Sequence, residues 1–230
     1  MKKITVNDKE LELPESWFEL TFNKFVKFTS LLGSQKTEKE IRAAYINEGF
    51  SEERADLKIG VDNMTFNTKI ASFWSGLSED EIAMLPMEKV EDILKCCSFV
   101  NDPYTPMVLD KFKFKDETYY LPKANMKKEN FGTFIEAEQI EINNKQMENG
   151  NLSVLPQQMA ILCKKEGEES GLIDDSVVER RTELFKELDM ATVWDVAFFL
   201  LRQESILLSS ILTYTRTQAT QKQELPQKGQ

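Results

Sequence analysis

The amino-acid sequence predicts a predominantly helical α+β fold, in which two β-hairpins form a small antiparallel sheet packed on a helical core. Capped, amphipathic helical patterns recur along most of the 230 residues, with only nine glycines and seven prolines to interrupt them. Two segments, Lys2–Leu13 and Phe112–Leu121, alternate apolar and polar residues as half-buried strands do. A nearly unbroken apolar stretch, Asp189–Thr215, supplies the expected core helix.

The first hairpin and the helix after it have clear turn and cap signals. Asn7-Asp8 supplies the turn of the hairpin, and Pro14 ends its returning strand because proline cannot donate a hydrogen bond to the ladder. A short linker follows. Thr21 is then placed to cap a helix with an apolar stripe, which Gly33 ends.

Residues 34–63 are more polar and are expected to form a helical insert of two short helices. Thr37 with Glu40 forms a capping box for the first helix, and Ser51 caps the second. Two short helices joined at a glycine also fit a helix-turn-helix, so a cytoplasmic regulatory or nucleic-acid-binding module is the alternative function. Acidic side chains on the second helix would repel phosphates, which favours a solvated insert.

Further helices complete the first half of the chain. Met64–Ser75 is amphipathic and is closed by Gly76, and Ser78 with Glu81 forms a second capping box. Another helix begins after Pro86. A connector that contains two prolines, Asn101–Pro106, ends this half.

The second half begins with the hairpin Phe112–Leu121, which is expected to turn around Asp116-Glu117. Helices are predicted after a cap at Asn130, within Leu152–Cys163 and over Val177–Leu188. Polar composition predicts mobile stretches at Glu141–Asn151 and Lys164–Asp174, and a disordered tail at 217–230. Residues 1–216 are expected to form one domain.

The stretch Asp189–Thr215 has two interpretations. A membrane span needs about 20 consecutive apolar residues, but Arg202–Glu204 cut the run short and Asp195 lies inside it. The sequence therefore favours a core helix over Val193–Tyr214, with its first half buried nearly all round.

The two halves also share an order of signals. Leu11-Glu12-Leu13-Pro14 corresponds to Tyr119-Tyr120-Leu121-Pro122, and each is followed by a capped helix with an F-x-x-F face, after Thr21 and Asn130 respectively. An internal duplication and chance similarity between amphipathic helices both account for this pattern. A duplication would place both hairpins in one sheet, where they cover each other's edges.

The amino-acid composition argues against several kinds of catalysis, ligand and partner. The net charge of −10 argues against a nucleic-acid partner, and the absence of histidine removes the commonest general base and metal ligand. Cys96, Cys97 and Cys163 lack metal-site spacing and are expected to be buried free thiols. No phosphate loop or nucleophile motif occurs, and Met1–Val6 has no apolar segment that would mark a signal peptide. We therefore expect no catalytic, cofactor-binding or metal-binding residue, no small-molecule substrate and no membrane partner.

Binding is instead expected at two kinds of segment. The first is the apolar linker after the first hairpin, where Trp17 and Phe18 are the candidate partner-binding residues if charge does not guide recognition. The second is the acidic stretch that contains Glu166, Glu168 and Glu169, which could meet a basic partner surface.

Several motifs together resemble a known family. They are L-P-x-S-W-x-x-L-T-F-x-x-F at Leu13–Phe25, S-G-L-S-E-D-E-I-A-M-L-P at Ser75–Pro86, Y-Y-L-P-x-x-N at Tyr119–Asn125, N-F-G-T-F-I-E-A-E-Q at Asn130–Gln139 and I-L-T-Y-T at Ile211–Thr215. This arrangement resembles small acidic proteins encoded among the virion genes of tailed phages of gut bacteria, the crAss-like phages and their relatives. The insert at 34–63 departs from that pattern.

The resemblance implies a role in virion morphogenesis, as a tail assembly chaperone or as a component of the particle. The implied partners are other phage virion or assembly proteins, and a homo-oligomer is left open. The implied location is the host cytoplasm during assembly and, for a component, the virion. The resemblance carries no active-site residue onto this sequence.

Overall fold

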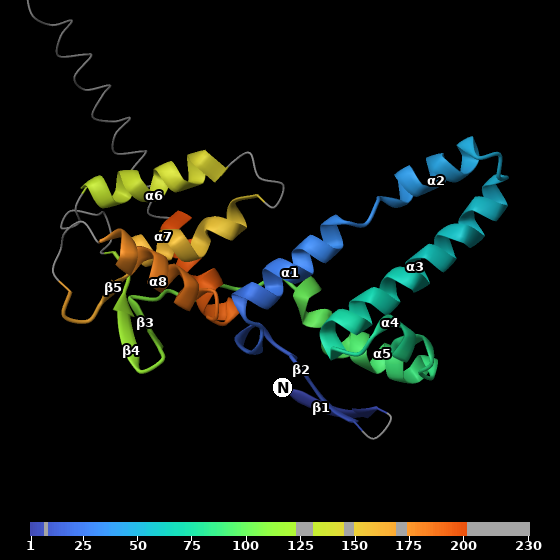
Figure 1. Ribbon diagram of the computed structural model, residues 1–230, viewed down its shortest axis with the longest axis horizontal. Coiled ribbons are helices and arrows are strands. Elements are labelled where there is room, and N and C mark those ends of the chain that lie inside the picture. The colour runs from blue at the N-terminus through green and yellow to red at the C-terminus, as the bar shows by residue number, and fades with distance from the viewer. Residues whose placement is uncertain (7–8, 123–130, 145–149, 169–173, 202–230) are drawn as a thin grey trace, which may run out of the picture. The chain divides into compact units, whose positions relative to one another are not determined.

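A computed structural model describes residues 1–6, 9–122, 131–144, 150–168 and 174–201 (Figure 1). The fold is α+β and mostly helical, as predicted, with one two-stranded and one three-stranded antiparallel sheet. The chain divides into two compact units, Met1–Tyr104 and Thr105–Gln230, where the sequence suggested one domain over 1–216. The division falls inside the connector Asn101–Pro106.

The prediction that both hairpins join one sheet is wrong. Strands β1 (Lys2–Val6) and β2 (Lys9–Leu13) pair only with each other in the first unit, with Ile4 opposite Leu11. In the second unit the edge of β4 is covered by a short strand, β5 (Lys164–Lys165). That stretch was predicted to be mobile, but backbone hydrogen bonding to β4 orders its first residues.

The hairpin of the second unit turns one residue earlier than predicted. Strands β3 (Lys111–Phe114) and β4 (Glu117–Tyr120) leave Lys115 and Asp116 as the turn, with φ of +45° and +65°. Positive φ at both central residues gives a two-residue turn whose twist matches that of the flanking strands.

In the first unit the predicted caps are confirmed. Thr21 caps α1 (Phe22–Gly33), and capping boxes begin α2 (Glu38–Asn47) and α4 (Glu79–Ala83). The 3-10 turn η1 (Trp17–Glu19) precedes α1, while α5 (Met87–Cys96) and η2 (Ser98–Asn101) end the unit.

The second half of the polar insert is not a separate short helix. Helix α3 runs without a break over Glu52–Ser75, because Gly60 is tolerated inside it at a cost of about 1 kcal/mol relative to alanine. Gly76 ends α3 with φ of +73°, a left-handed conformation that suits glycine. The core of this unit includes Phe28 and Trp74, whose ring centroids lie 4.8 Å apart.

In the second unit three helices pack on one another, and the last of them contacts the three-stranded sheet through its side chains. Helix α6 (Phe131–Asn144) contacts α7 (Leu155–Leu162), and α7 contacts α8 (Asp175–Phe185). The predicted loop Glu141–Asn151 is partly wrong, because α6 continues through Asn144 and the 3-10 segment η3 (Gly150–Val154) precedes α7. Residues 145–149 of that loop lie outside the described residues. Phe185 packs against Phe112 and Tyr119, with centroid distances of 5.6 and 4.9 Å.

The predicted core helix is helical at residues 190–201, and Asp189 caps it by accepting the Thr192 N–H at 2.8 Å. Its burial is less complete than predicted. Val193 and Val196 are buried, but Phe198 and Leu201 are exposed. The rest of the predicted helix and the tail 217–230 lie outside the described residues. Within the described ranges, no helix is both long and apolar enough to cross a bilayer.

Candidate interaction surfaces

The linker residues Trp17 and Phe18 lie in η1 and have different surroundings. The Trp17 ring makes edge contacts with Phe25 and Phe99, each with a centroid distance of 5.5 Å, and with Tyr104 at 6.4 Å. Phe18 is 61% exposed. Trp17 is therefore a framework residue, and Phe18 is the one of the pair that a partner can reach.

Hydrogen bonds fasten the backbone around Phe18. The Glu15 N–H donates to Glu19 Oε2 at 2.8 Å, and the Glu19 N–H donates to the Ser16 carbonyl at 3.1 Å. Together with the packed Trp17 ring, these bonds hold the Phe18 backbone in place on an otherwise irregular segment.

The predicted acidic residues take part in local interactions. Glu166 accepts the Tyr120 hydroxyl at 3.1 Å, and Glu168 accepts the Lys165 N–H at 2.8 Å and pairs with Arg181. Glu169 lies outside the described residues. The two described glutamates thus brace the edge of the three-stranded sheet.

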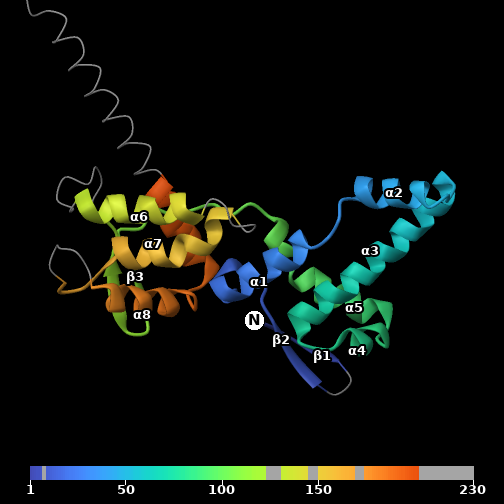
Figure 2. The ribbon, with the colours of Figure 1, turned by 45° about the horizontal axis from the view of Figure 1, so that its top comes forward.

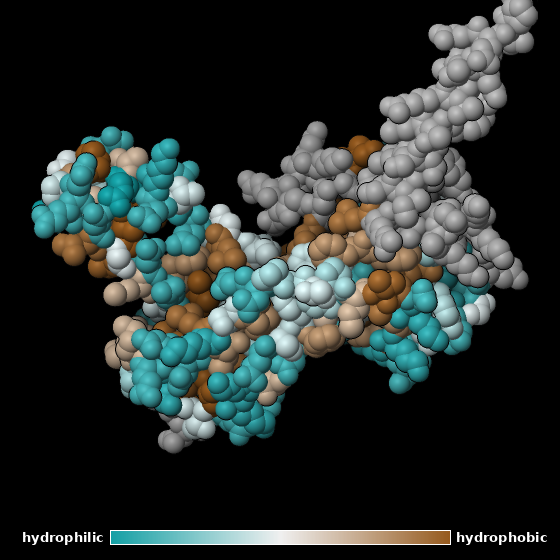
Figure 3. All heavy atoms as spheres, turned by 180° about the vertical axis from the view of Figure 1, so that it is seen from behind, coloured by the Kyte–Doolittle hydropathy of each residue, from teal (hydrophilic) through white to brown (hydrophobic). Residues whose placement is uncertain are grey.

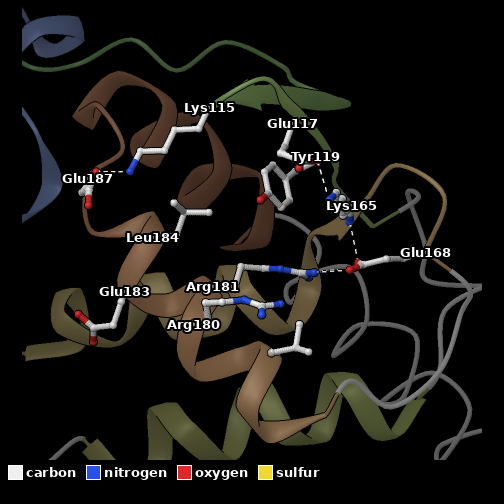
Figure 4. A pocket seen from close by; sticks show the side chains of 11 residues that line it. Lys115, Glu117, Tyr119, Lys165, Glu168, Arg180, Arg181, Glu183, Leu184 and Glu187 are labelled. Atoms are coloured by element: carbon white, nitrogen blue, oxygen red, sulfur yellow. Dashed lines mark hydrogen bonds and ion pairs between the residues drawn. The ribbon is translucent and has the colours of Figure 1, made fainter.

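A cleft of about 720 Å³ lies between that sheet and α8 (Figure 4). Its lining includes four basic and four acidic side chains, and most of these charges pair with one another. Lys165 pairs with Glu117 at 2.8 Å, Lys115 with Glu187, and Arg181 with Glu168. Balanced charge gives this cleft no preference for an anionic or a cationic ligand.

Arg181 is a buried, charged residue of this cleft. Its guanidinium donates to the carbonyls of Ala160 and Cys163 at 3.2 and 3.0 Å, where α7 ends, and it lies 5.6 Å from the Tyr119 ring centroid. A cation at a helix C-terminus complements the helix dipole. Arg181 therefore joins α7, α8 and the sheet, and sequence reasoning missed it because the residues it joins are far apart along the chain.

A second surface lies on the part of the first unit that residues 38–64 form, which we call the arm. Figures 1 and 2 show α2 and the amino-terminal half of α3 extending beyond α4 and α5. Inside the arm, Tyr45 donates its hydroxyl to Asp62 at 2.6 Å and Arg42 pairs with Asp56. No residue of α2 is buried, so the two helices share only a thin contact.

The outer face of the arm carries exposed apolar side chains. Leu57, Val61 and Met64 of α3 are 72%, 62% and 62% exposed. Figure 3 shows brown apolar atoms interrupting the hydrophilic surface of the arm. Sequence reasoning treated the insert as solvated, although the spacing of these three residues by four and three was visible in the sequence.

The described residues contain no group of three or more acidic, cysteine or histidine side chains arranged to hold a metal ion. Cys96, Cys97 and Cys163 are buried free thiols, as predicted. Burial raises the pKa of Cys97 and of Cys163 to about 12, which keeps both thiols protonated.

Comparisons with known proteins identify no relative of this chain. No protein-family model matches this chain, and no curated protein or solved structure proves similar to it. The expected role in virion assembly therefore stays a prediction from sequence motifs.

Proposed function

We propose that this chain is a non-enzymatic assembly protein of tailed-phage virions that acts by binding other virion or assembly proteins. It serves as a structural tail, neck or internal component of the particle, or as a tail assembly chaperone in the host cytoplasm. The observation that carries the proposal is Phe18, a large aromatic side chain exposed on a turn whose backbone is held by hydrogen bonds.

Exposed aromatic rings on rigid supports are typical of binding hot spots. A phenylalanine that is held at its backbone loses little conformational freedom when a partner covers it, so more of the burial energy appears as affinity. The turn also lies inside one of the motifs that resemble the phage family, in which Trp17 is a specified residue and position 18 is not.

The test uses the tagged full-length chain in phage-infected cells, with mass spectrometry of captured proteins. We expect the wild type to capture a virion or tail assembly protein, and Phe18→Ala to weaken that binding by about tenfold or more. Met87→Ala is the matched control, because Met87 is also exposed but lies at the start of α5. Equal capture by wild type and Phe18→Ala would contradict the proposal.

Purified virions separate the two roles. Many copies of the chain in the particle indicate a structural component, whereas absence from the particle together with capture of a tail protein indicates a chaperone. Nucleic acid that stays bound at moderate salt would instead favour the alternative, a regulatory module that binds through residues 34–63.

A further inference from the structure

The exposed face of α3 follows a heptad pattern. Arg54, Leu57, Val61, Met64 and Thr68 succeed one another at spacings of three, four, three and four residues. In heptad terms, Val61 occupies an a position, and Leu57 and Met64 occupy d positions. A β-branched residue at a with leucine at d favours parallel, two-stranded pairing of helices.

This face is free for a second helix. Helix α2 packs on the other side of α3, through Asp56 and Asp62, so it leaves the heptad face uncovered. Leu57, Val61 and Met64 are each more than half exposed, and no described element covers them. Three large apolar side chains in one line on a projecting arm form a seam without a partner.

The charges beside the seam identify the orientation of the partner. Glu53 lies at a g position on one edge and Lys58 at the following e position on the other edge. In a parallel pair, each g residue lies next to the e residue of the following heptad in the partner, so Glu53 meets Lys58 on both sides. An antiparallel pair would instead bring equal edges together and would leave Glu53 and Lys58 of the two chains without each other.

The two charged residues differ in their contacts within one chain. Among the described residues Glu53 has no ion-pair partner. The Lys58 ammonium lies 4.7 Å from the ring centroids of Tyr45 and Phe50, toward α2, so in the dimer it leaves these rings to reach Glu53 of the second copy.

We propose that α3 pairs in parallel with α3 of a second copy of this chain, with Leu57, Val61 and Met64 as the seam and Glu53–Lys58 ion pairs on both edges. The inference goes beyond the proposed function and does not depend on Phe18. Because the seam is short, we expect a reversible dimer with a dissociation constant on the order of micromolar.

Sedimentation velocity of the full-length chain across the micromolar range tests the proposal. We expect the wild type to shift from monomer to dimer, and Val61→Lys to weaken association by about tenfold or more, since it places two like charges in the seam. Met84→Lys is the matched control, because Met84 is 85% exposed outside the seam, and it should associate as the wild type does. Phe18→Ala should also leave association unchanged, which separates this inference from the proposed function.

A charge swap and a cross-link test the geometry. Glu53→Lys should weaken the dimer, and adding Lys58→Glu to the same chain should restore it. A Leu57→Cys chain should form an interchain disulfide with itself, because equal positions meet in a parallel pair. A disulfide that forms only between Leu57→Cys and Met64→Cys chains would overturn the parallel arrangement.

Two other results would overturn the proposal. One is a wild type that stays monomeric throughout the concentration range. The other is a Val61→Lys chain that associates as strongly as the wild type. If the wild type is monomeric and a helix of another protein binds in a manner sensitive to Val61→Lys, the seam belongs to that protein and not to a second copy.

Discussion

At the scale of single residues, Glu81 couples the first hairpin to α4. Its carboxylate accepts hydrogen bonds from Lys9 Nζ and from the Ser78 N–H, both at 2.8 Å, and these lower its pKa from 4.5 to about 2. The ionised form therefore stabilises the fold above pH 4.5, and this contribution is lost as pH falls from about 4.5 to about 2. We expect Glu81→Gln to make the free energy of unfolding less dependent on pH in that window, measured by urea unfolding. Lys9→Gln keeps the Ser78 bonds, so the pH dependence of its unfolding free energy should lie between those of the wild type and Glu81→Gln. A Glu81→Gln chain with the same pH dependence as the wild type would contradict this account.

The same residue shows what a sequence can predict. The capping boxes at Ser78–Glu81 and Thr37–Glu40 form between residues three apart, so their pattern was sufficient to predict them. The exposure of Phe18 depends on rings at Phe25, Phe99 and Tyr104, which fix Trp17 and leave its neighbour outside. The sequence thus indicated both residues as candidates but not which of the two faces solvent.

At the scale of elements, the turn between β3 and β4 uses an unfavourable residue. Lys115 has φ of +45°, which a side chain with a Cβ adopts at a cost and glycine adopts readily. We expect Lys115→Gly to stabilise the protein by about 0.5–1 kcal/mol when the comparison is made in a Glu187→Gln background. That background removes the exposed Lys115–Glu187 ion pair, so its loss does not obscure the turn effect. Chemical denaturation measures the difference, and a loss of stability in that background would refute the assignment of the turn.

Elements that depend on distant residues were the ones that sequence patterns missed. Pairing of β5 with β4 joins Lys164 to Tyr120, more than forty positions apart, and no local signal marks a two-residue strand. Continuity of α3 through Gly60 was missed because the polar residues around it suggested a break, while the cost of an internal glycine is small.

At the scale of the whole molecule, each unit has its own core. Phe28 packs with Trp74 in Met1–Tyr104, and Phe185 packs with Phe112 and Tyr119 in Thr105–Gln230. We expect fragments 1–104 and 105–230, made separately, to be helical and to unfold cooperatively. Far-ultraviolet circular dichroism during denaturation measures this. A fragment without a cooperative transition would show that its core needs the other half of the chain.

The placement of the tryptophans allows intrinsic fluorescence to report on each half of the chain separately. The sequence has three tryptophans: Trp17 and Trp74 lie in the first unit, and Trp194 lies in the second. Trp17 is enclosed by aromatic rings, and Trp74 has the Lys24 ammonium 5.2 Å from its ring, so each indole has distinct surroundings in the native fold. A chain with phenylalanine at position 194 would emit from the first unit alone, and one with phenylalanine at 17 and 74 from the second alone. Fluorescence can then follow the melting of either half inside the intact chain, without an added dye.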